Sequence, residues 1–375
     1  GVAVDGVTIK DGNVGATGTA TSVAGIPFFS DTTNGSIYTH DVSGTDSTAE
    51  NNTAYGLTAL DAITTGDKNV AVGKGSLGAL TTGEHNIGIG FNAADGFDTE
   101  TNNIGIGSNA LGGGSLAGGE FNVAVGVNAL DALTSADKNV AIGYGAGTGL
   151  TTGGSNVIIG YEAVTGTYTG ADAVMVGRDA GKALTSGNYS TLIGKSAGSA
   201  ITTGHRNIAV GTLAMYQFDT EDDNLGVGYQ ALGGSVAGGE YNVAIGNYSL
   251  DALTSADKVT AIGYNAGSGL TTGGLNTFIG HGAASNGTVT GVNNNAIGQA
   301  ALYALAGGGY NQAFGVSALQ SCTGGDYNIA IGNAALFTLD TEQHNLGIGH
   351  GALEVVNSGG EYNVAVGNYT LDALT

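Results

Sequence analysis

The sequence is poor in cysteine, proline, tryptophan and positive charge, and each shortage excludes a class of protein. A single cysteine excludes a disulfide-stapled scaffold, and a single proline excludes collagen despite the abundant glycine. Only 9 Lys and Arg stand against 31 Asp and Glu, giving a net charge of −22. Residues 259–375 contain no Lys or Arg, so no basic face for nucleic acid is expected there. No apolar run reaches the roughly 18 residues of a membrane-spanning helix.

The chain is instead rich in glycine and in small apolar residues. It has 71 glycines, and 41% of its residues are hydrophobic, which is too many for a disordered acidic chain. These residues follow a period of 17, as in NVAVGKGSLGALTTGEH (69–85), NIGIGFNAADGFDTETN (86–102) and NVAIGYGAGTGLTTGGS (139–155). Nineteen such repeats, a few with one- or two-residue insertions, begin between residues 52 and 363. The sequence therefore predicts a repeat architecture.

A longer period lies on top of the short one. FDTETNNIGIG begins at Phe97, FDTEDDNLGVG at Phe218 and LDTEQHNLGIG at Leu339, with 121 residues between successive starts. This spacing corresponds to about seven repeats. The array therefore grew by duplication of seven-repeat blocks.

The repeat positions, numbered 1 to 17, predict an all-β parallel β-roll or β-solenoid of about 19 coils. Position 1 is Asn in 16 repeats, position 4 is Val or Ile in 17, and position 5 is Gly in all 19. Alternating β-branched residues predict a strand over positions 1–5, and we expect each coil to hold two short strands joined by two turns. Side chains at positions 2, 4, 9 and 12 are expected to fill the coil, and the Asn side chains to form a ladder. The glycine indicates positive φ or no room for a Cβ atom.

Position 3 is expected on the strand face opposite to positions 2 and 4. It is Ala or Gly in 15 repeats, and the exceptions, Ile158, Met175, Leu192 and Phe278, are also uncharged. A strand that is apolar on both faces is buried on both, so this stripe predicts contact with another subunit of a symmetric homo-oligomer. The alternative is a weakly apolar surface on a monomer.

The recurring NVAVG, NIGIG and NVAIG strands, each followed by a small residue and a glycine-punctuated turn, resemble a known repeat. They are similar to the head repeats of YadA-like trimeric autotransporter adhesins, which are also found in bacteriophage tail fibres, and the motif recurs through residues 52–375. The resemblance implies a left-handed β-roll, three chains per molecule and one roll per chain. The family's repeat is usually nearer 14 residues, so we expect a longer second turn here. Residues 1–51, with the sole proline Pro27, are predicted to form a connector or small β module.

The function that this resemblance implies is that of an extracellular structural fibre. We expect a homotrimeric rod of a phage tail fibre or similar appendage, serving as a stiff spacer and host-attachment surface. Its partners would be a host-surface glycan or protein receptor and other virion or appendage proteins, with multivalency strengthening weak contacts. The alternatives are a bacterial surface adhesin of the same repeat type and a glycan-degrading tailspike enzyme. The enzyme is disfavoured because no repeat is disrupted enough to form a groove.

No catalytic, cofactor-binding or metal-ligating residue is predicted. The acidic clusters at Asp98 and Glu100 and at Asp219–Asp223 recur with the long period, so we interpret them as solvated surface, with loosely bound calcium as the alternative. Cys322 occupies position 12 and is predicted to be a small core residue. The six His residues follow no fixed motif.

Two columns of polar residues on the turns leave alternatives open. Threonine pairs recur at one coil position. An uninterrupted ladder of such pairs would suit ice binding, but in several coils other residues replace the threonines. Tyrosines occupy positions 6 and 7, where they either cover adjacent turns or contact sugar rings or a protein partner. They are Tyr144, Tyr161, Tyr229 and Tyr264 at position 6, and Tyr248 and Tyr369 at position 7.

Overall fold

The computed structural model describes the N-terminal strands and residues 48–113, 119–234, 238–356 and 359–374. The chain forms two compact units, Gly1–Asp172 and Ala173–Thr375. In the first unit the N-terminal strands pair antiparallel, β1 with β2, β3 with β4 and β4 with β5, and β5 then pairs parallel with β6. These strands are β1 (Ala3–Val4), β2 (Val7–Thr8), β3 (Thr21–Val23), β4 (Ile26–Asp31) and β5 (Ser36–Tyr38). The other residues up to Ser47 lie outside the described part, so the predicted connector at 1–51 stays a prediction.

Both units are parallel β-solenoids with a 17-residue coil, which confirms the predicted fold class. The first unit contains β6 (Thr53–Tyr55), β7 (Val70–Val72), β8 (Ile87–Ile89), β9 (Ile104–Ile106), β10 (Val123–Val125), β11 (Val140–Ile142) and β12 (Val157–Ile159). The second unit contains β13 (Val174–Val176), β14 (Thr191–Ile193), β15 (Ile208–Val210), β16 (Leu225–Val227), β17 (Val243–Ile245), β18 (Thr260–Ile262), β19 (Thr277–Ile279), β20 (Asn295–Ile297), β21 (Gln312–Phe314), β22 (Ile329–Ile331), β23 (Leu346–Ile348) and β25 (Val364–Val366). A second, short parallel pair joins β24 (Val355–Val356) to β26 (Ala373–Leu374).

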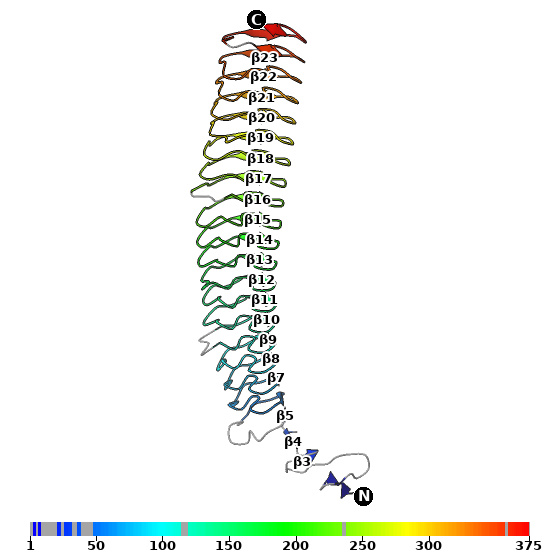
Figure 1. Cartoon of the computed structure of the whole chain (residues 1–375). Coiled ribbons are helices and arrows are strands. Elements are labelled where there is room, and N and C mark those ends of the chain that lie inside the picture. The colour runs from blue at the N-terminus through cyan, green and yellow to red at the C-terminus, as the bar shows by residue number, and fades with distance from the viewer. Residues whose placement is uncertain are drawn as a thin grey trace. The chain divides into compact units, whose positions relative to one another are not determined.

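Equal repeat positions face each other in neighbouring coils. In the second unit Val174 pairs with Thr191 and Thr191 with Ile208, so each step along the ladder is one repeat. An insertion lengthens a step without shifting the register, as between Leu225 and Val243. Figure 1 shows the strands of this unit one above another. A parallel ladder of this kind rises about 4.8 Å per coil.

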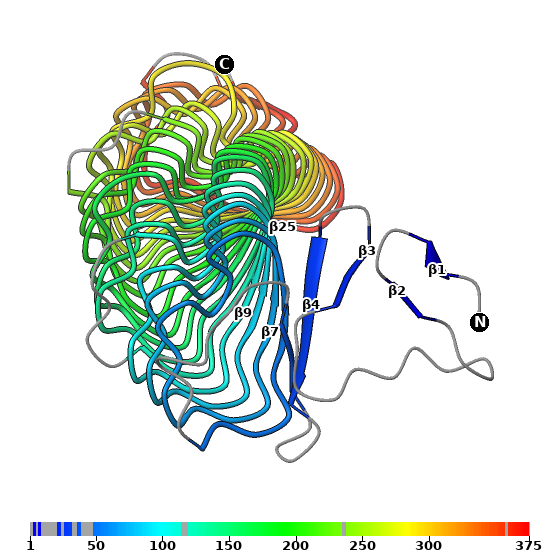
Figure 2. The same cartoon turned by 90° about the horizontal axis from the view of Figure 1, so that it is seen from below.

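The prediction of two strands per coil is wrong for most coils. In the described residues β24 and β26 give the last two coils a second strand, whereas the earlier coils have one three-residue strand and otherwise consist of turns. Figure 2, which looks along the stack, shows the coils as loops with the turns opposite the strand. Non-glycine residues at positions 7, 9 and 17 have φ between +48° and +62°. These left-handed residues turn the chain sharply at fixed positions of each coil. Backbone hydrogen bonds still join these turns across coils, as from Leu77 N–H to Ala93 O at 2.9 Å.

The predicted assignment of the two strand faces is also wrong. Position 3 points into the coil of its own chain, and its side chains are buried throughout the array, from Ala54 to Ala365. Positions 2 and 4 point outward and are partly exposed, as in β17, where Val243 and Ile245 flank the buried Ala244. The coil is thin, so position 3 is Ala or Gly in every coil that has Leu at position 9, and larger residues occur at position 3 only where position 9 is smaller than Leu. In the coil that begins at residue 294, Ala296, Ala301, Leu302 and Leu305 are all fully buried.

Two recurring features, the position-1 Asn side chains and the position-5 glycines, lie where successive coils meet. The Asn ladder is confirmed: Asn311 accepts the N–H of Asn328 on its Oδ1 at 3.0 Å and donates from Nδ2 to Gly325 O at 2.6 Å. Each amide therefore pairs one backbone N–H and one backbone C=O inside the coil, where an unpaired polar group would be costly. The position-5 glycines have φ between +126° and +147°, as the sequence predicted.

The secondary structure of the described segments consists of strands, turns and bends. No helix that could cross a bilayer occurs among those residues.

Candidate functional site

Turn side chains that point outward form columns, because residues at the same repeat position lie one coil apart. In the first unit Tyr144 stacks on Tyr161, with ring centroids 5.3 Å apart and planes 13° apart. Both rings are about half exposed. The turn tyrosines thus contact one another across coils and still present a surface to solvent.

The second unit carries a longer aromatic column of four rings. Tyr248 meets Tyr229 at 5.3 Å with planes 77° apart, and it meets Tyr264 at 6.0 Å with planes 84° apart. Tyr264 in turn stacks on His281 at 5.3 Å and 12°. Tyr248 therefore interrupts the parallel stacking and stands at right angles to both of its neighbours.

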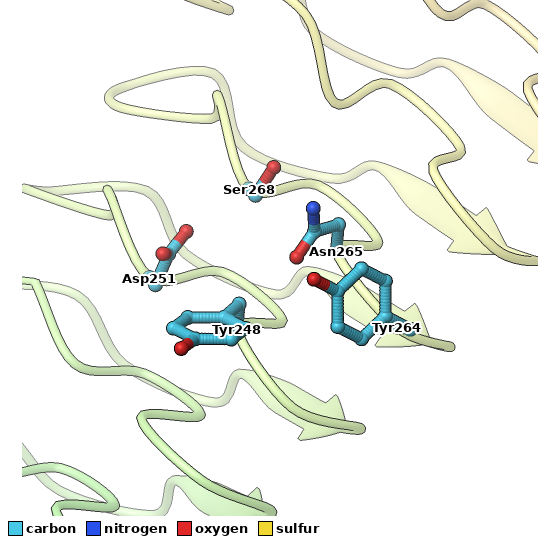
Figure 3. A pocket seen from close by; sticks show the side chains of 5 residues that line it. All are labelled: Tyr248, Asp251, Tyr264, Asn265 and Ser268. Carbon is cyan, nitrogen blue, oxygen red and sulfur yellow. The ribbon is translucent and has the colours of Figure 1, made fainter.

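A cavity of about 370 Å³, broadly open to solvent, lies at this change of ring orientation. It is lined by Tyr248 and Asp251 of one coil and by Tyr264, Asn265 and Ser268 of the next. Figure 3 shows the two rings in different orientations, with Asp251 and Ser268 to one side of them and Asn265 beside Tyr264. The volume is at the lower end of the roughly 300–1,000 Å³ of small-molecule sites. Two aromatic walls, a carboxylate, an amide and a hydroxyl converge here.

The carboxyl group of Asp251 is the most perturbed acid of this surface. Burial beside the rings raises the pKa of Asp251 to about 6, and a hydrogen bond from its own backbone N–H opposes that rise. The pKa of Tyr248 is raised too, chiefly by loss of solvent and also by the neighbouring Tyr229. Perturbed groups of this kind in a cavity mark a candidate site.

The first unit holds a degenerate copy of this arrangement at the same repeat positions. Asp131 corresponds to Asp251 and Tyr144 to Tyr264, but Asn128 stands in place of Tyr248 and Gly145 in place of Asn265. Burial raises the pKa of Asp131 as well, so the carboxylate environment is shared. The second ring and the amide are what distinguish the site in the second unit.

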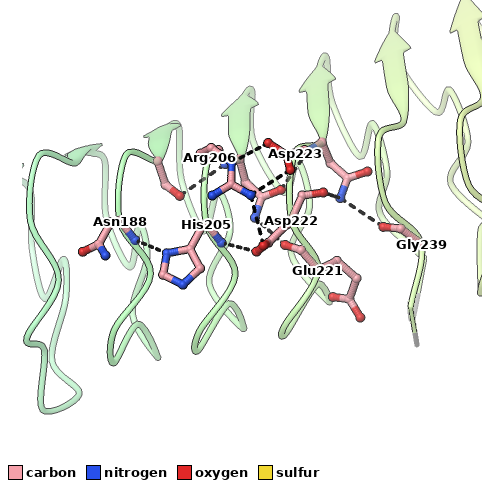
Figure 4. A network of polar contacts seen from close by, with 10 residues as sticks. Asn188, His205, Arg206, Glu221, Asp222, Asp223 and Gly239 are labelled. Atoms are coloured by element: carbon pink, nitrogen blue, oxygen red, sulfur yellow. Dashed lines mark hydrogen bonds and ion pairs between the residues drawn. The ribbon is translucent and has the colours of Figure 1, made fainter.

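One of the predicted acidic clusters contains an ion-pair network that joins neighbouring coils (Figure 4). Arg206 holds Asp223 with two hydrogen bonds, from Nε at 2.6 Å and from Nη2 at 2.8 Å, and reaches Asp222 at 3.2 Å. His205 N–H donates to Asp222, and Asn188 N–H donates to the Nδ1 atom of His205 at 3.0 Å. The Arg206 guanidinium lowers the pKa of Asp223. These groups are engaged with each other, which indicates a structural role.

The glutamates of the same clusters are not solvated surface, contrary to the sequence interpretation. Glu100, Glu221 and Glu342 are buried, with at most 6% of each residue exposed. Glu221 accepts the N–H groups of Asp219 and Thr220 on one oxygen and that of Gly238 on the other. Glu342 does the same, accepting the N–H groups of Asp340 and Thr341 on one oxygen and that of Gly359 on the other.

Threonine and cysteine have structural positions in the described coils. The first threonine of each pair donates its hydroxyl to the carbonyl one coil further on, as Thr64 Oγ1 does to Thr81 O at 3.0 Å. This use inside the stack disfavours an ice-binding surface. Cys322 is fully buried, as predicted, and burial raises the pKa of its thiol to about 12, so it is a poor nucleophile.

Sequence reasoning overlooked a second aromatic column, at position 17. Tyr310, Tyr327, His344 and Tyr362 stack in turn, with centroids 4.8–5.1 Å apart and planes within 10° of parallel. Their spacing of 17 or 18 residues was the available signal. All four rings of this column stack in parallel, whereas Tyr248 stands edge-to-face with both of its neighbours in the column that lines the cavity.

No group of three or more His, Cys, Asp or Glu that could hold a metal ion occurs in the described coils and strands. In comparisons with known proteins, no family model matches the chain and no curated protein matches its sequence.

Proposed function

We propose that this protein is a structural fibre segment, a homotrimeric β-solenoid shaft of an extracellular appendage such as a phage tail fibre. It acts as a spacer and an attachment surface. The observation that carries the proposal is the outward strand face, where Val and Ile side chains at positions 2 and 4 recur from coil to coil. At position 4, Ile142, Ile245 and Ile331 are 37–41% exposed in the single chain.

Such columns favour association between chains. Monomeric proteins rarely expose contiguous apolar patches above a few hundred Å², and larger ones mark interaction sites. A column with a one-coil repeat is matched by the same column on an identical chain, so closed symmetric assembly follows naturally. The proposed number of three chains per molecule comes from the resemblance to YadA-like head repeats. We therefore still propose a contact between subunits, but through positions 2 and 4 in place of the buried position 3.

The stack itself suits a mechanical role. Within each unit neighbouring coils are bonded through their strands, and most of them also through the Asn ladder, so stability is close to a sum over neighbouring coils. A bacterial surface adhesin of the same repeat type remains the second candidate, because it would use the same shaft. A glycan-degrading enzyme is not favoured by the candidate site, which has a single carboxylate where glycosidases use two.

The test is absolute mass by light scattering on the full chain and on two matched triple variants. Wild type should have three times the 36.6 kDa mass of one chain. Ile245→Asp, Ile262→Asp and Ile279→Asp together place charges on the strand face and should give the monomer mass. Ser255→Asp, Thr272→Asp and Thr290→Asp add the same charge to exposed turns of the same coils and should leave the trimer intact. A wild-type monomer, or a control that dissociates equally, would contradict the proposal.

A further inference from the structure

We propose that the cavity between Tyr248 and Tyr264 binds a neutral pyranose ring of a surface glycan. This inference deepens the attachment role proposed above and rests on it only for its biological purpose, since one chain supplies the whole site. The lining residues all lie in two adjacent coils of the second unit. The number of chains in the molecule therefore does not decide whether the cavity can bind.

The walls fit a sugar better than a flat aromatic ligand. The planes of Tyr248 and Tyr264 are 84° apart, so together they form a corner rather than a slot. A pyranose is a puckered ring with apolar C–H faces and polar edges, and aromatic faces accept C–H groups favourably. One ring of the corner can receive a C–H face while the other bounds the edge.

The polar groups of the corner have hydrogen-bonding capacity to spare. Within the described residues, the hydroxyls of Tyr248 and Tyr264 and the side-chain amide of Asn265 bond to no other residue. Asp251 is engaged only by its own backbone N–H, and Ser268 donates to Ser285 O at 3.3 Å while its oxygen stays able to accept. A carboxylate, an amide and a hydroxyl can together accept and donate along the hydroxyl-bearing edge of a sugar.

Charge restricts the class of sugar. Asp251 would face a bound ring, and the chain as a whole carries a net charge of −22. An acidic sugar would bring a second carboxylate into this negative field and would be repelled. A neutral pyranoside offers hydroxyl donors to Asp251 without that cost.

Saturation-transfer NMR on the full chain at pH 7.5 tests the inference with named probes. They are methyl glycosides of glucose, galactose, mannose and N-acetylglucosamine, with methyl glucuronide as the acidic comparison. We expect transfer to the ring C–H protons of at least one neutral glycoside and none to the glucuronide. Tyr264→Ala should abolish that transfer, and Asp251→Asn should weaken binding about tenfold, as expected for loss of a charged hydrogen-bond acceptor.

The degenerate copy in the first unit provides matched controls. Tyr144→Ala and Asp131→Asn change the same repeat positions and should leave the transfer unchanged. Circular dichroism of each variant checks that the solenoid is intact. The inference is overturned if wild type shows no transfer from any neutral probe, if the glucuronide binds equally, or if the two pairs of variants behave alike. Light scattering on the same samples separates this outcome from failure of the trimer: a monomer that binds the sugar upholds the site, and a trimer that does not bind refutes it.

Discussion

A Cβ atom added to Gly298 would lie 2.3 Å from the carbonyl oxygen of Gly315, its equivalent in the next coil. The backbone of Gly298 also has a φ of +142°, which side chains rarely adopt. The same pairing recurs at position 5 along both units, so the glycine column sets how closely coils can approach.

Gly298→Ala should therefore destabilise the protein by at least about 2 kcal/mol, through overpacking against backbone and a strained φ. Gly307 of the same coil is the control, because a Cβ there would have its nearest neighbour at 4.0 Å and its φ is not positive. Gly307→Ala should change stability by less than about 1 kcal/mol. Urea unfolding followed by circular dichroism measures both, and equal effects would refute the close-approach argument.

The Asn ladder makes a second prediction. Asn311→Ala would leave the buried N–H of Asn328 and one bond of Gly325 O unmade, and we expect a loss of about 3 kcal/mol in unfolding free energy. The reverse change is available at Val259, which breaks the ladder between Asn242 and Asn276. Val259→Asn should raise stability by about 1 kcal/mol. A neutral Asn311→Ala would show that the ladder contributes little.

Asp251 predicts a pH dependence of stability. Its folded pKa, about 6, is above the ordinary 3.8, so the folded state holds this proton more tightly than the unfolded state. Its contribution to stability therefore falls as pH rises from about 4 to about 6 and is constant above that range. Asp251→Asn removes this cost and should be about 1 kcal/mol more stable than wild type at pH 7.5, with the difference vanishing near pH 4, after allowance for its partial exposure.

Asp223→Asn is the control of opposite sign. Arg206 lowers the pKa of Asp223, so its contribution is present above the ordinary pKa and is lost as pH falls through the lowered value. That variant should be less stable than wild type at pH 7.5, with the difference shrinking in acid. Thermal unfolding across the pH range compares the three proteins, and parallel curves for both variants would contradict the assignments.

The sequence predicted the repeat, the strand, the Asn ladder and the glycine column, because each depends on contacts between equal positions of successive coils. It did not predict which strand face is interior, since both faces are apolar. The sequence sign of the interior face is that side-chain sizes at positions 3 and 9 are complementary. A Cβ on Gly147 would meet Ile158 Cδ1 at 3.1 Å, and one on Gly267 would meet Phe278 Cδ2 at 2.9 Å. A large residue at position 3 thus fills the space that glycine leaves at position 9.

The candidate site was predictable only in part. The turn tyrosines could be read individually from the repeat, as could Asp251 at position 10. Their convergence depends on left-handed residues, such as Tyr248 and Asn265, which direct the turn and which no residue pattern required. No residue pattern signals the positive φ of Leu at position 9 either, and this φ shapes the turn that follows the strand.

We propose that the outward strand face lies between chains. Distance measurement by electron–electron double resonance tests this directly, with single spin labels in a Cys322→Leu background that carries the usual position-12 residue. Labels at Ile262→Cys on the strand face and Thr272→Cys on a turn of the same coil occupy exposed sites. We expect measurable distances between chains for the labels at residues 262 and 272, with the distances at residue 262 clearly shorter. The absence of any distance between chains, or shorter distances at residue 272, would contradict it.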